Sequence, residues 1–348
     1  MRASSRPNLN RTESQSHQIS VAPSRPAGHP VEMLRIASLT DDRAAFEIDR
    51  AAAEVDSPDI PFGSFEAYRA RLRHPWPGSE LEQFLAVRDG VGVGHLALAL
   101  PQLDNVANVN LELVVHPGHR RRGTGRALIA FAVERAGALG RRHIIGETGA
   151  RAGASFAAAV GAAPGLVEIR SRWELGAAEP ADTPVAPGYR LVRWTGVAPE
   201  EYVDDLGYLD SRLNVDAPVG DLPWEPEKVD AARIRAAEAA HRVRHRVAFH
   251  TGAVHEGSGR LVAWTLITSR DDVPRHAWQL ITIVDPGHRG HGLGLAIKNQ
   301  NLRYVRSARP AVRVIDTYNA AGNVHMLRIN RLMGFRKVDE VTLWQLTV

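Results

Sequence analysis

The sequence contains no cysteine. This absence excludes thiolate catalysis, thiolate metal ligands and disulfide bonds. Lysine is nearly absent as well, because only three of the 43 basic residues are lysines and the other 40 are arginines. Arginine keeps its charge at any working pH and binds phosphate through a forked pair of donors. A general preference for arginine codons would produce the same bias, so we assign a function only to arginines that lie in a motif.

Long hydrophobic runs are also missing. No apolar stretch approaches the roughly 18 residues of a membrane span. The segment 1–30 is rich in Ser, Arg, Pro, Asn and Gln and lacks the apolar core of a secretion signal, which predicts a disordered leader. The chain has 348 residues, 44% of them hydrophobic and 24% charged, and a net charge of +4. This composition is typical of a soluble globular protein. We expect a cytoplasmic protein that binds neither membranes nor nucleic acid.

One internal repeat organises the chain. The segments LVVHPGHRRRGTGRALI (113–129) and TIVDPGHRGHGLGLAIK (282–298) align without gaps and are identical at eight of 17 positions. Their offset is 169 residues, about the size of one domain. A Pro/Ala/Gly-rich stretch lies between them at 176–188. We therefore predict a linker at 176–188 that joins two tandem copies of one domain, at 31–175 and 189–348.

Both repeats alternate strand and helix patterns, which predicts an α/β fold with a mixed sheet in each domain. The expected strands are 32–37, 83–88, 92–100 and 109–115 in the first repeat and 189–194, 246–255, 261–269 and 277–284 in the second. The expected helices are 40–53, 58–73 and 124–139 in the first repeat and a helical region around 199–206, then 225–246 and 293–307, in the second.

The repeated motif has the form strand, Pro-Gly-His-Arg, and then Arg-x-x-Gly-x-Gly at the start of a helix. The first turn of a helix carries unpaired N–H groups and the positive end of the helix dipole. Glycines let a phosphate approach these amides, and they stand at Gly123 and Gly125 and at Gly292 and Gly294. Arg120 and Arg289 add positive charge. We predict a pyrophosphate site in each copy, with a tightly packed turn as the alternative.

Two other glycine-rich motifs fit less well. A nucleotide-triphosphate loop needs Gly-Lys followed by Ser or Thr, which is absent here. A dinucleotide-binding fingerprint needs a third glycine, which is missing.

The repeated motif resembles motif A of the GCN5-related N-acetyltransferase (GNAT) family. In the second repeat, an expected strand at 312–317 and the segment TYNAAGNVHMLRINRLMGF (317–335) look like the last strand and helix of that family, which end in a Gly-Phe turn. The resemblance covers both repeats, roughly 300 residues. The tandem arrangement resembles two-domain acyltransferases of actinobacteria. The resemblance therefore implies two GNAT-like domains.

The resemblance also implies that the protein binds acetyl-CoA. No metal is expected, because His241 and His245 have the spacing of metal ligands but no third ligand is evident. The pyrophosphate would lie on the glycine-rich loop, and the pantetheine would lie beside the strand that precedes it. The implied acetyl-CoA-binding residues are Leu113, Val114, Val115, Arg120, Arg121, Arg122, Gly123, Thr124, Gly125 and Arg126 in the first repeat, and Thr282, Ile283, Val284, Arg289, Gly290, His291, Gly292, Leu293, Gly294, Asn319 and Asn323 in the second.

Family members usually transfer the acetyl group directly to an amine, without a covalent enzyme intermediate, which suits a chain without cysteine. The implied acceptor is a small-molecule amine, such as a metabolite or an antibiotic. A backbone N–H near Val115 or Val284 would stabilise the developing oxyanion. Glu112, on the strand before the motif, is the predicted base; a surface ion pair is its alternative role. The aligned residue in the second repeat is Ile281, so Thr282, Gln279 or a water would have to serve there.

The family often places a tyrosine four residues before the Gly-Phe turn, as the acid that protonates the leaving thiolate. Here the equivalent residues are Ala157 and Asn330. Tyr318 and His325 are the substitutes considered, and Tyr318 is the predicted one. Two other functions stay open: one catalytic repeat with a structural or regulatory CoA-binding partner repeat, or a non-catalytic interaction protein with the same fold. We expect a monomer or a homodimer.

Overall fold

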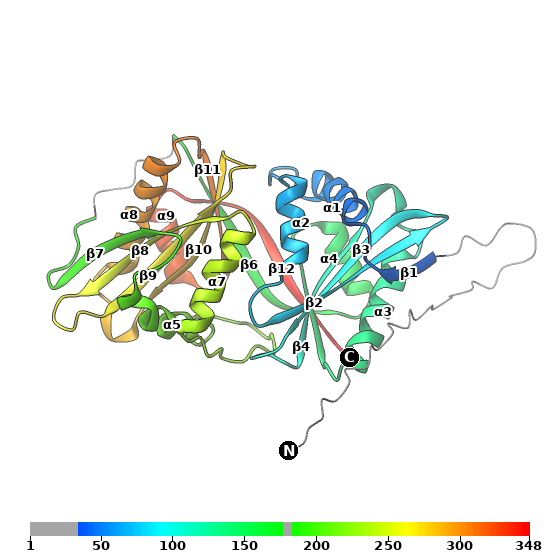
Figure 1. Ribbon diagram of the computed structural model, residues 1–348, viewed down its shortest axis with the longest axis horizontal. Helices are drawn as coiled ribbons and strands as arrows, with labels where there is room; N and C mark the ends of the chain where they lie inside the picture. The colour runs from blue at the N-terminus through cyan, green and yellow to red at the C-terminus, as the bar shows by residue number, and fades with distance from the viewer. Residues whose placement is uncertain (1–33, 177–182) are drawn as a thin grey trace, which may run out of the picture.

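Each repeat folds as an alternation of strands and helices in the computed structural model, which describes residues 34–176 and 183–348 (Figure 1). The first repeat contains β1 (Leu34–Ser38), α1 (Asp42–Asp56), α2 (Phe65–Arg73), β2 (Ser79–Arg88), β3 (Val91–Pro101), β4 (Asn108–Val115), the 3-10 turn η1 (Pro117–His119), α3 (Thr124–Ala138), β5 (His143–Thr148), α4 (Arg151–Ala159) and β6 (Ala163–Glu174). The second contains β7 (Tyr189–Thr195), η2 (Glu200–Tyr202), α5 (Val203–Ser211), α6 (Leu213–Asp216), α7 (Ala231–Val243), β8 (Val247–His255), β9 (Leu261–Ser269), β10 (His276–Val284), η3 (Pro286–His288), α8 (Leu293–Ala308), β11 (Val314–Ala320), α9 (Val324–Leu332) and β12 (Arg336–Thr347).

The expected strand and helix on either side of each repeated loop are present to within one or two residues. The expected helix at 225–246 was wrong in its limits, because α7 begins only at Ala231. The side chain of Asp230 accepts the N–H of Arg233 and caps the helix there. Pro226 lies just upstream, and a proline disfavours helical geometry in the residue before it. The predicted leader at 1–30 and part of the predicted linker lie outside the described residues.

Helices cover both faces of the sheet. In the first repeat, His95 of β3 contacts Asp49 of α1, whereas a Cβ on the adjacent Gly94 would contact Leu128 of α3. Neighbouring residues of a strand point to opposite faces, so α1 and α3 lie on opposite sides of the sheet. In the second repeat, Trp264 of β9 belongs to the apolar core shared with α5 and α7, and the adjacent Ala263 packs with α8. The predicted mixed α/β sheet is confirmed in both repeats.

The two repeats exchange their last strands within one 12-stranded sheet, whose order is β1-β2-β3-β4-β5-β12-β6-β11-β10-β9-β8-β7. The end of the first repeat, β6, pairs with β11 of the second. The end of the second repeat, β12, pairs with β5 of the first. Figure 1 shows β6 in green and β12 in red passing between the two halves. The proposed domains at 31–175 and 189–348 therefore describe sequence repeats, each completed by a strand of the other.

A buried carboxylate joins the strands at this junction. Asp316 of β11 is fully buried, and both its oxygens accept hydrogen bonds from Arg172 of β6 at 2.7 Å. His276 of β10 and Arg170 of β6 also contact it, at 3.1 and 3.4 Å. Burial alone would raise the pKa of Asp316, but the bonds from Arg172 and His276 hold it down at about 2. The ionised form is therefore the stable one in the folded protein.

Replacing Asp316 by alanine should destabilise the fold, because it removes the fully buried acceptor of Arg172, Arg170 and His276. The two guanidinium groups would keep only the more exposed carboxylates of Asp59 and Asp339. We expect the free energy of unfolding to fall by about 3–5 kcal/mol in urea titrations at pH 7. The control is Asp271→Ala, which removes an exposed partner of Arg309 and should cost less than about 1 kcal/mol. Equal losses in the two variants would contradict a special role of the Asp316 contacts.

Candidate active site

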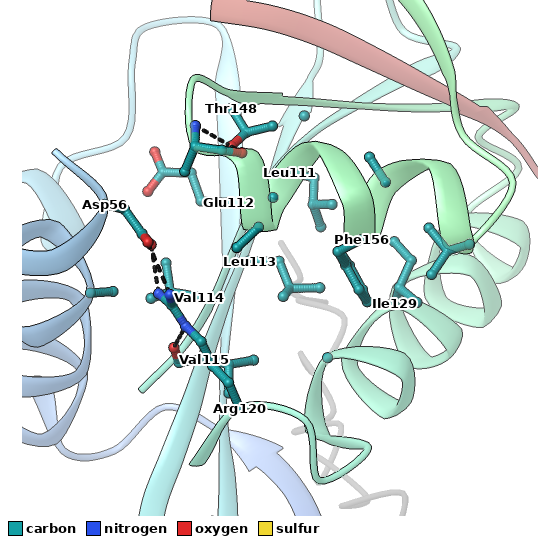
Figure 2. Close-up of a pocket in the computed structure, with 18 of the residues that line it drawn as sticks. Asp56, Leu111, Glu112, Leu113, Val114, Val115, Arg120, Ile129, Thr148 and Phe156 are labelled. Carbon is teal, nitrogen blue, oxygen red and sulfur yellow. Dashed lines mark hydrogen bonds and ion pairs between the residues drawn. The ribbon is translucent and has the colours of Figure 1, made fainter. Parts of the chain in front are cut away.

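The two central strands of the first repeat separate and open a cavity between them. Strands β4 and β5 pair in parallel from Asn108 and His143 to Leu111 and Gly146, and no pairing continues beyond. A cavity of about 1100 Å³ begins here and is lined by both strands, the start of α3 and α4 (Figure 2). The N–H of His116 donates a hydrogen bond to the carbonyl of Val93 on β3. Because backbone N–H groups alternate sides along a strand, those of Leu113 and Val115 point toward the opening.

The loop between β4 and α3 leaves the start of the helix accessible. The His116 ring accepts the N–H of Gly118 at 3.2 Å and sets the turn η1. Gly123 then begins α3 with φ +83° and without a capping side chain. A Cβ at Gly123 would meet no atom within 4 Å, so the positive φ rather than crowding favours glycine. A Cβ at Gly125, in contrast, would lie 3.1 Å from the ring of Phe156 in α4.

Arg120 does not point into this loop. Its guanidinium donates to both carboxylate oxygens of Asp56, at the end of α1, and to the carbonyl of Val115 (Figure 2). The side chain thus ties the loop to α1 and β4. Arg121 and Arg122 are exposed on the loop, and Arg126 is exposed on the first turn of α3. Of the first-repeat residues expected at the site, all but Arg122 line the cavity: Glu112, Leu113, Val114, Val115, Arg120, Arg121, Gly123, Thr124, Gly125 and Arg126.

Two glutamates flank the point where the strands separate. Glu112 and Glu147 directly follow the last parallel pair, on β4 and β5, and both line the cavity. Both oxygens of Glu112 accept from Arg71 of α2, at 2.8 and 2.6 Å. Desolvation, and then the charge of Glu112, raise the pKa of Glu147. Desolvation and the charge of Glu147 likewise raise the pKa of Glu168 on β6.

Glu112 was predicted from the sequence, whereas Glu147 was missed. The available signal was the apolar run His-Ile-Ile-Gly-Glu at 143–147, which follows the helix of the motif and forms β5. Tyr318 was predicted as the acid of the second repeat. It lies on β11 and pairs with Arg170 of β6, on the same strand as Glu168. Burial raises the pKa of Tyr318 to about 12, and the charge of Glu147 contributes to that shift. The strand exchange therefore brings Tyr318 toward the acidic residues of the first repeat.

The comparisons with known proteins agree with this geometry. The model of the Acetyltransferase (GNAT) family matches residues 44–155. A mycothiol acetyltransferase of Mycolicibacterium gilvum is 31% identical over 314 residues, which cover 87% of this chain and 94% of that protein. The chain belongs to the GNAT family. A mycothiol acetyltransferase of Cellulomonas flavigena is 29% identical over 236 residues, which span 65% of this chain and 64% of that protein.

A solved tandem GNAT protein from the clavulanic acid biosynthesis pathway shares the fold over both repeats. It is 30% identical with a TM-score of 0.78, and the match covers 90% of this chain and 98% of that one. The predicted family, its tandem form and an acetyltransferase activity of GNAT type are thus confirmed. Within the described part of this GNAT protein, no helix is long and apolar enough to cross a membrane.

The second repeat of this GNAT protein keeps the loop but not the acids. Strands β10 and β11 separate after Gln279 and Thr317, and the next residue of β10 is the exposed Leu280, not a glutamate. The Gln279 amide donates to Thr265 and to the Leu266 carbonyl, filling the bulge in β10. The hydroxyl of Thr282 is bonded to Thr265 at 2.8 Å. Both side chains considered as substitutes for a base are therefore engaged within the sheet.

The remaining second-repeat candidates also make internal contacts. Arg289 donates to Asp216, and Asn323 caps α9 by accepting the N–H of Met326. The amide of Asn330 donates to Asn319 at 2.7 Å. Ile283 and Leu293 lie in the apolar core, and Val284 packs against it. The loop before α8 is exposed at Gly290, His291 and Gly292, whereas Gly294, in the first turn of α8, is half-buried. Neither of the two cavities described in residues 34–176 and 183–348 is lined by this loop.

The end of α7 packs against the loop after α2, on the second-repeat side of the site. The ring of His241 lies 5.2 Å from that of Trp76, and Arg244 donates to the carbonyl of His74. His241 is buried, and burial together with the charges of Arg246 and Arg244 lowers its pKa to about 4. The imidazole is therefore neutral in the folded protein near pH 7.

The neutral state of His241 makes stability depend on pH. The unfolded chain binds a proton at this residue below about pH 6.5, whereas the folded chain binds it only near pH 4. Stability is therefore lost as the pH falls from 7 to 5, by about 2 kcal/mol from this residue. Urea titrations of His241→Phe should show a pH dependence smaller by that amount, and the exposed His245→Gln serves as the control. An unchanged pH dependence in His241→Phe would contradict this assignment.

Proposed function

We propose that this protein transfers the acetyl group of acetyl-CoA directly to the amine of a small molecule, and that the first repeat carries the reaction. The observation that carries this proposal is the cavity of about 1100 Å³, which links the uncapped start of α3 to the strand opening flanked by Glu112 and Glu147. The second repeat would act as a structural partner, because Leu280 follows the last strand pair where the first repeat has Glu112.

The residues of the cavity fit acetyl-CoA. The free N–H groups at the start of α3 suit a pyrophosphate, and the exposed Arg121, Arg122 and Arg126 add positive charge beside them. The gap between β4 and β5 offers the N–H groups of Leu113 and Val115 to the pantetheine amides and to the thioester oxygen. Phe156 and Ile129 supply apolar surface in the same cavity (Figure 2).

The proposed reaction requires a base for the amine proton. The amine nitrogen attacks the thioester carbon, the C–S bond breaks, and the CoA thiolate leaves. Glu147 has no hydrogen bond or ion pair with any described residue, whereas Glu112 is held by Arg71. We therefore assign the proton acceptor to Glu147, with Glu112 raising its pKa. Tyr318 is the proposed proton donor to the thiolate; it lies on β11, which pairs with β6, on the same sheet face as Glu168.

A negative charge placed in the loop should block acetyl-CoA binding in the first repeat. Gly123→Asp puts a carboxylate at the pyrophosphate position and should weaken acetyl-CoA binding about 100-fold or more in calorimetry. Gly123→Asn is the matched control, since asparagine has the same shape and tolerates positive φ without adding charge.

The equivalent change Gly292→Asp tests the second loop, where the glycine has φ +71°. We expect it to leave the affinity and a stoichiometry of one unchanged. Two bound molecules in the parent protein would contradict a single site, and no binding at all would overturn the proposed function.

Removal of the Glu147 carboxylate should slow the acetyl transfer itself. Glu147→Gln should lower kcat about 10²- to 10⁴-fold in a thiol-release assay, with acetyl-CoA affinity retained. The exposed Glu134→Gln on α3 is the control. A Glu147→Gln variant with the parent rate would rule out this base.

The pH profile gives a second test of the same base. The base must be ionised, so kcat/KM of the parent should fall as the pH drops through the raised pKa of Glu147. Glu112→Gln removes the negative charge that raises this pKa and should move the acidic limb to lower pH. A shift to higher pH would contradict the coupling of the two carboxylates.

A further inference from the structure

Four arginines lie near one another beside the proposed site, where the loop after α2 packs against the end of α7. Three of them have partners in the protein. Arg71 binds Glu112, Arg244 binds the carbonyl of His74, and Arg270 pairs with Asp272 at 3.0 Å. The fourth is Arg246, whose guanidinium has no hydrogen bond or ion pair with any residue that the structure describes, although the residue is half-buried. No contact within the described protein accounts for the position of this positive charge.

The sheet register locates Arg246 on the face that carries the site. Val247 pairs with Ser269 at the end of β8 and β9, so Arg246 lies next to Arg270. The Arg270 guanidinium lies 5.6 Å from the centre of the Trp278 ring, and Trp278 pairs with Asp316, two residues before Tyr318. Paired residues share a face of the sheet. Arg246 therefore lies on the same face of the sheet as Tyr318. It follows the end of α7, which contacts the loop after α2.

The surroundings of Arg246 are positive. Burial, and then the charges of Arg244, Arg270 and Arg71, lower its pKa to about 10. A guanidinium removed from water without an acceptor is unfavourable, and the neighbouring cations add to that cost. An anion bound at this position would reverse both effects. The other side of the site has the opposite character, since Glu147 and Glu168 have no cationic partner among the described residues.

We propose that the acceptor amine also carries an anionic group, which Arg246 binds while the amine lies at Glu112 and Glu147. This inference rests on the proposed function and specifies its substrate class. The forked donors of arginine match a carboxylate or a phosphate, and the two walls of opposite charge suit a small molecule with an amine at one end and an acid at the other. Arg246 belongs to the second repeat, so that repeat determines specificity for a reaction in the first.

Matched amine pairs test the proposal. The thiol-release assay compares glycylglycine with glycylglycine amide, and phosphoethanolamine with ethanolamine. The parent protein should show kcat/KM about 10- to 100-fold higher for the anionic member of at least one pair. A preference in the first pair identifies a carboxylate, and one in the second identifies a phosphate.

Variants assign the preference to Arg246. Arg246→Gln should reduce the ratio toward one, mainly through KM, and Arg246→Lys should restore part of it. Arg242→Gln removes an exposed arginine from α7 and should keep the parent ratio. Calorimetry with acetyl-CoA checks that the first-repeat cavity of each variant is intact.

Two results overturn the inference alone: equal kcat/KM within both pairs in the parent, or an unchanged ratio in Arg246→Gln. Failure of the proposed function gives a different result, since the protein would then bind no acetyl-CoA or release no thiol with any amine.

Discussion

The exchange of β6 and β12 is the constraint on which the structure depends. Each half of the sheet is completed by the last strand of the other repeat, so neither repeat can bury its central strands alone. Asp316 fixes this junction, because its buried carboxylate holds Arg172 and Arg170 of the exchanged strand. Trp344 and Leu346 of the exchanged strand β12 also line the first-repeat cavity. The strand that completes the first repeat therefore also shapes its cavity.

The exchange also explains how a duplicated fold can become asymmetric. Both repeats keep the turn, the positive-φ glycine and the strand separation, because these features depend on local geometry. The residues that surround the opening differ. The first repeat has Glu112 and Glu147 beside a large cavity, whereas Gln279 and Thr282 of the second are engaged in hydrogen bonds within the sheet. One repeat is then free to contribute side chains to the site of the other.

The electrostatics of the site follow from this division. Carboxylates from β4, β5 and β6 occupy the first-repeat side, and arginines at the end of α7 and β9 occupy the second-repeat side. Arg71 connects the two groups, since it binds Glu112 and its charge also acts on Arg246. In the proposed reaction, a substrate between them would meet Glu147 at one end and, at the other, the Arg246 guanidinium, which has no partner among the described residues. Among the many arginines of the chain, a few therefore make specific contacts, such as that of Arg71 with Glu112.

Sequence patterns alone predicted the tandem repeat, the α/β class and the two loops. These depend on hydrophobic periodicity, on glycines such as Gly123 at positive φ and on turn residues such as His116, all of which act within a few neighbouring residues. These patterns did not predict β5, β6 and β12. Strand β6 pairs with β11, and β12 pairs with β5, and in both pairs the two strands lie more than a hundred residues apart in the chain. The packing of distant segments was needed to show that Arg120 binds Asp56, that Glu147 lies opposite Glu112, and that the Arg246 guanidinium has no partner among the described residues. The reason is physical: the charge state and partners of a side chain depend on which distant segments pack around it, and the sequence pattern records only its neighbours along the chain.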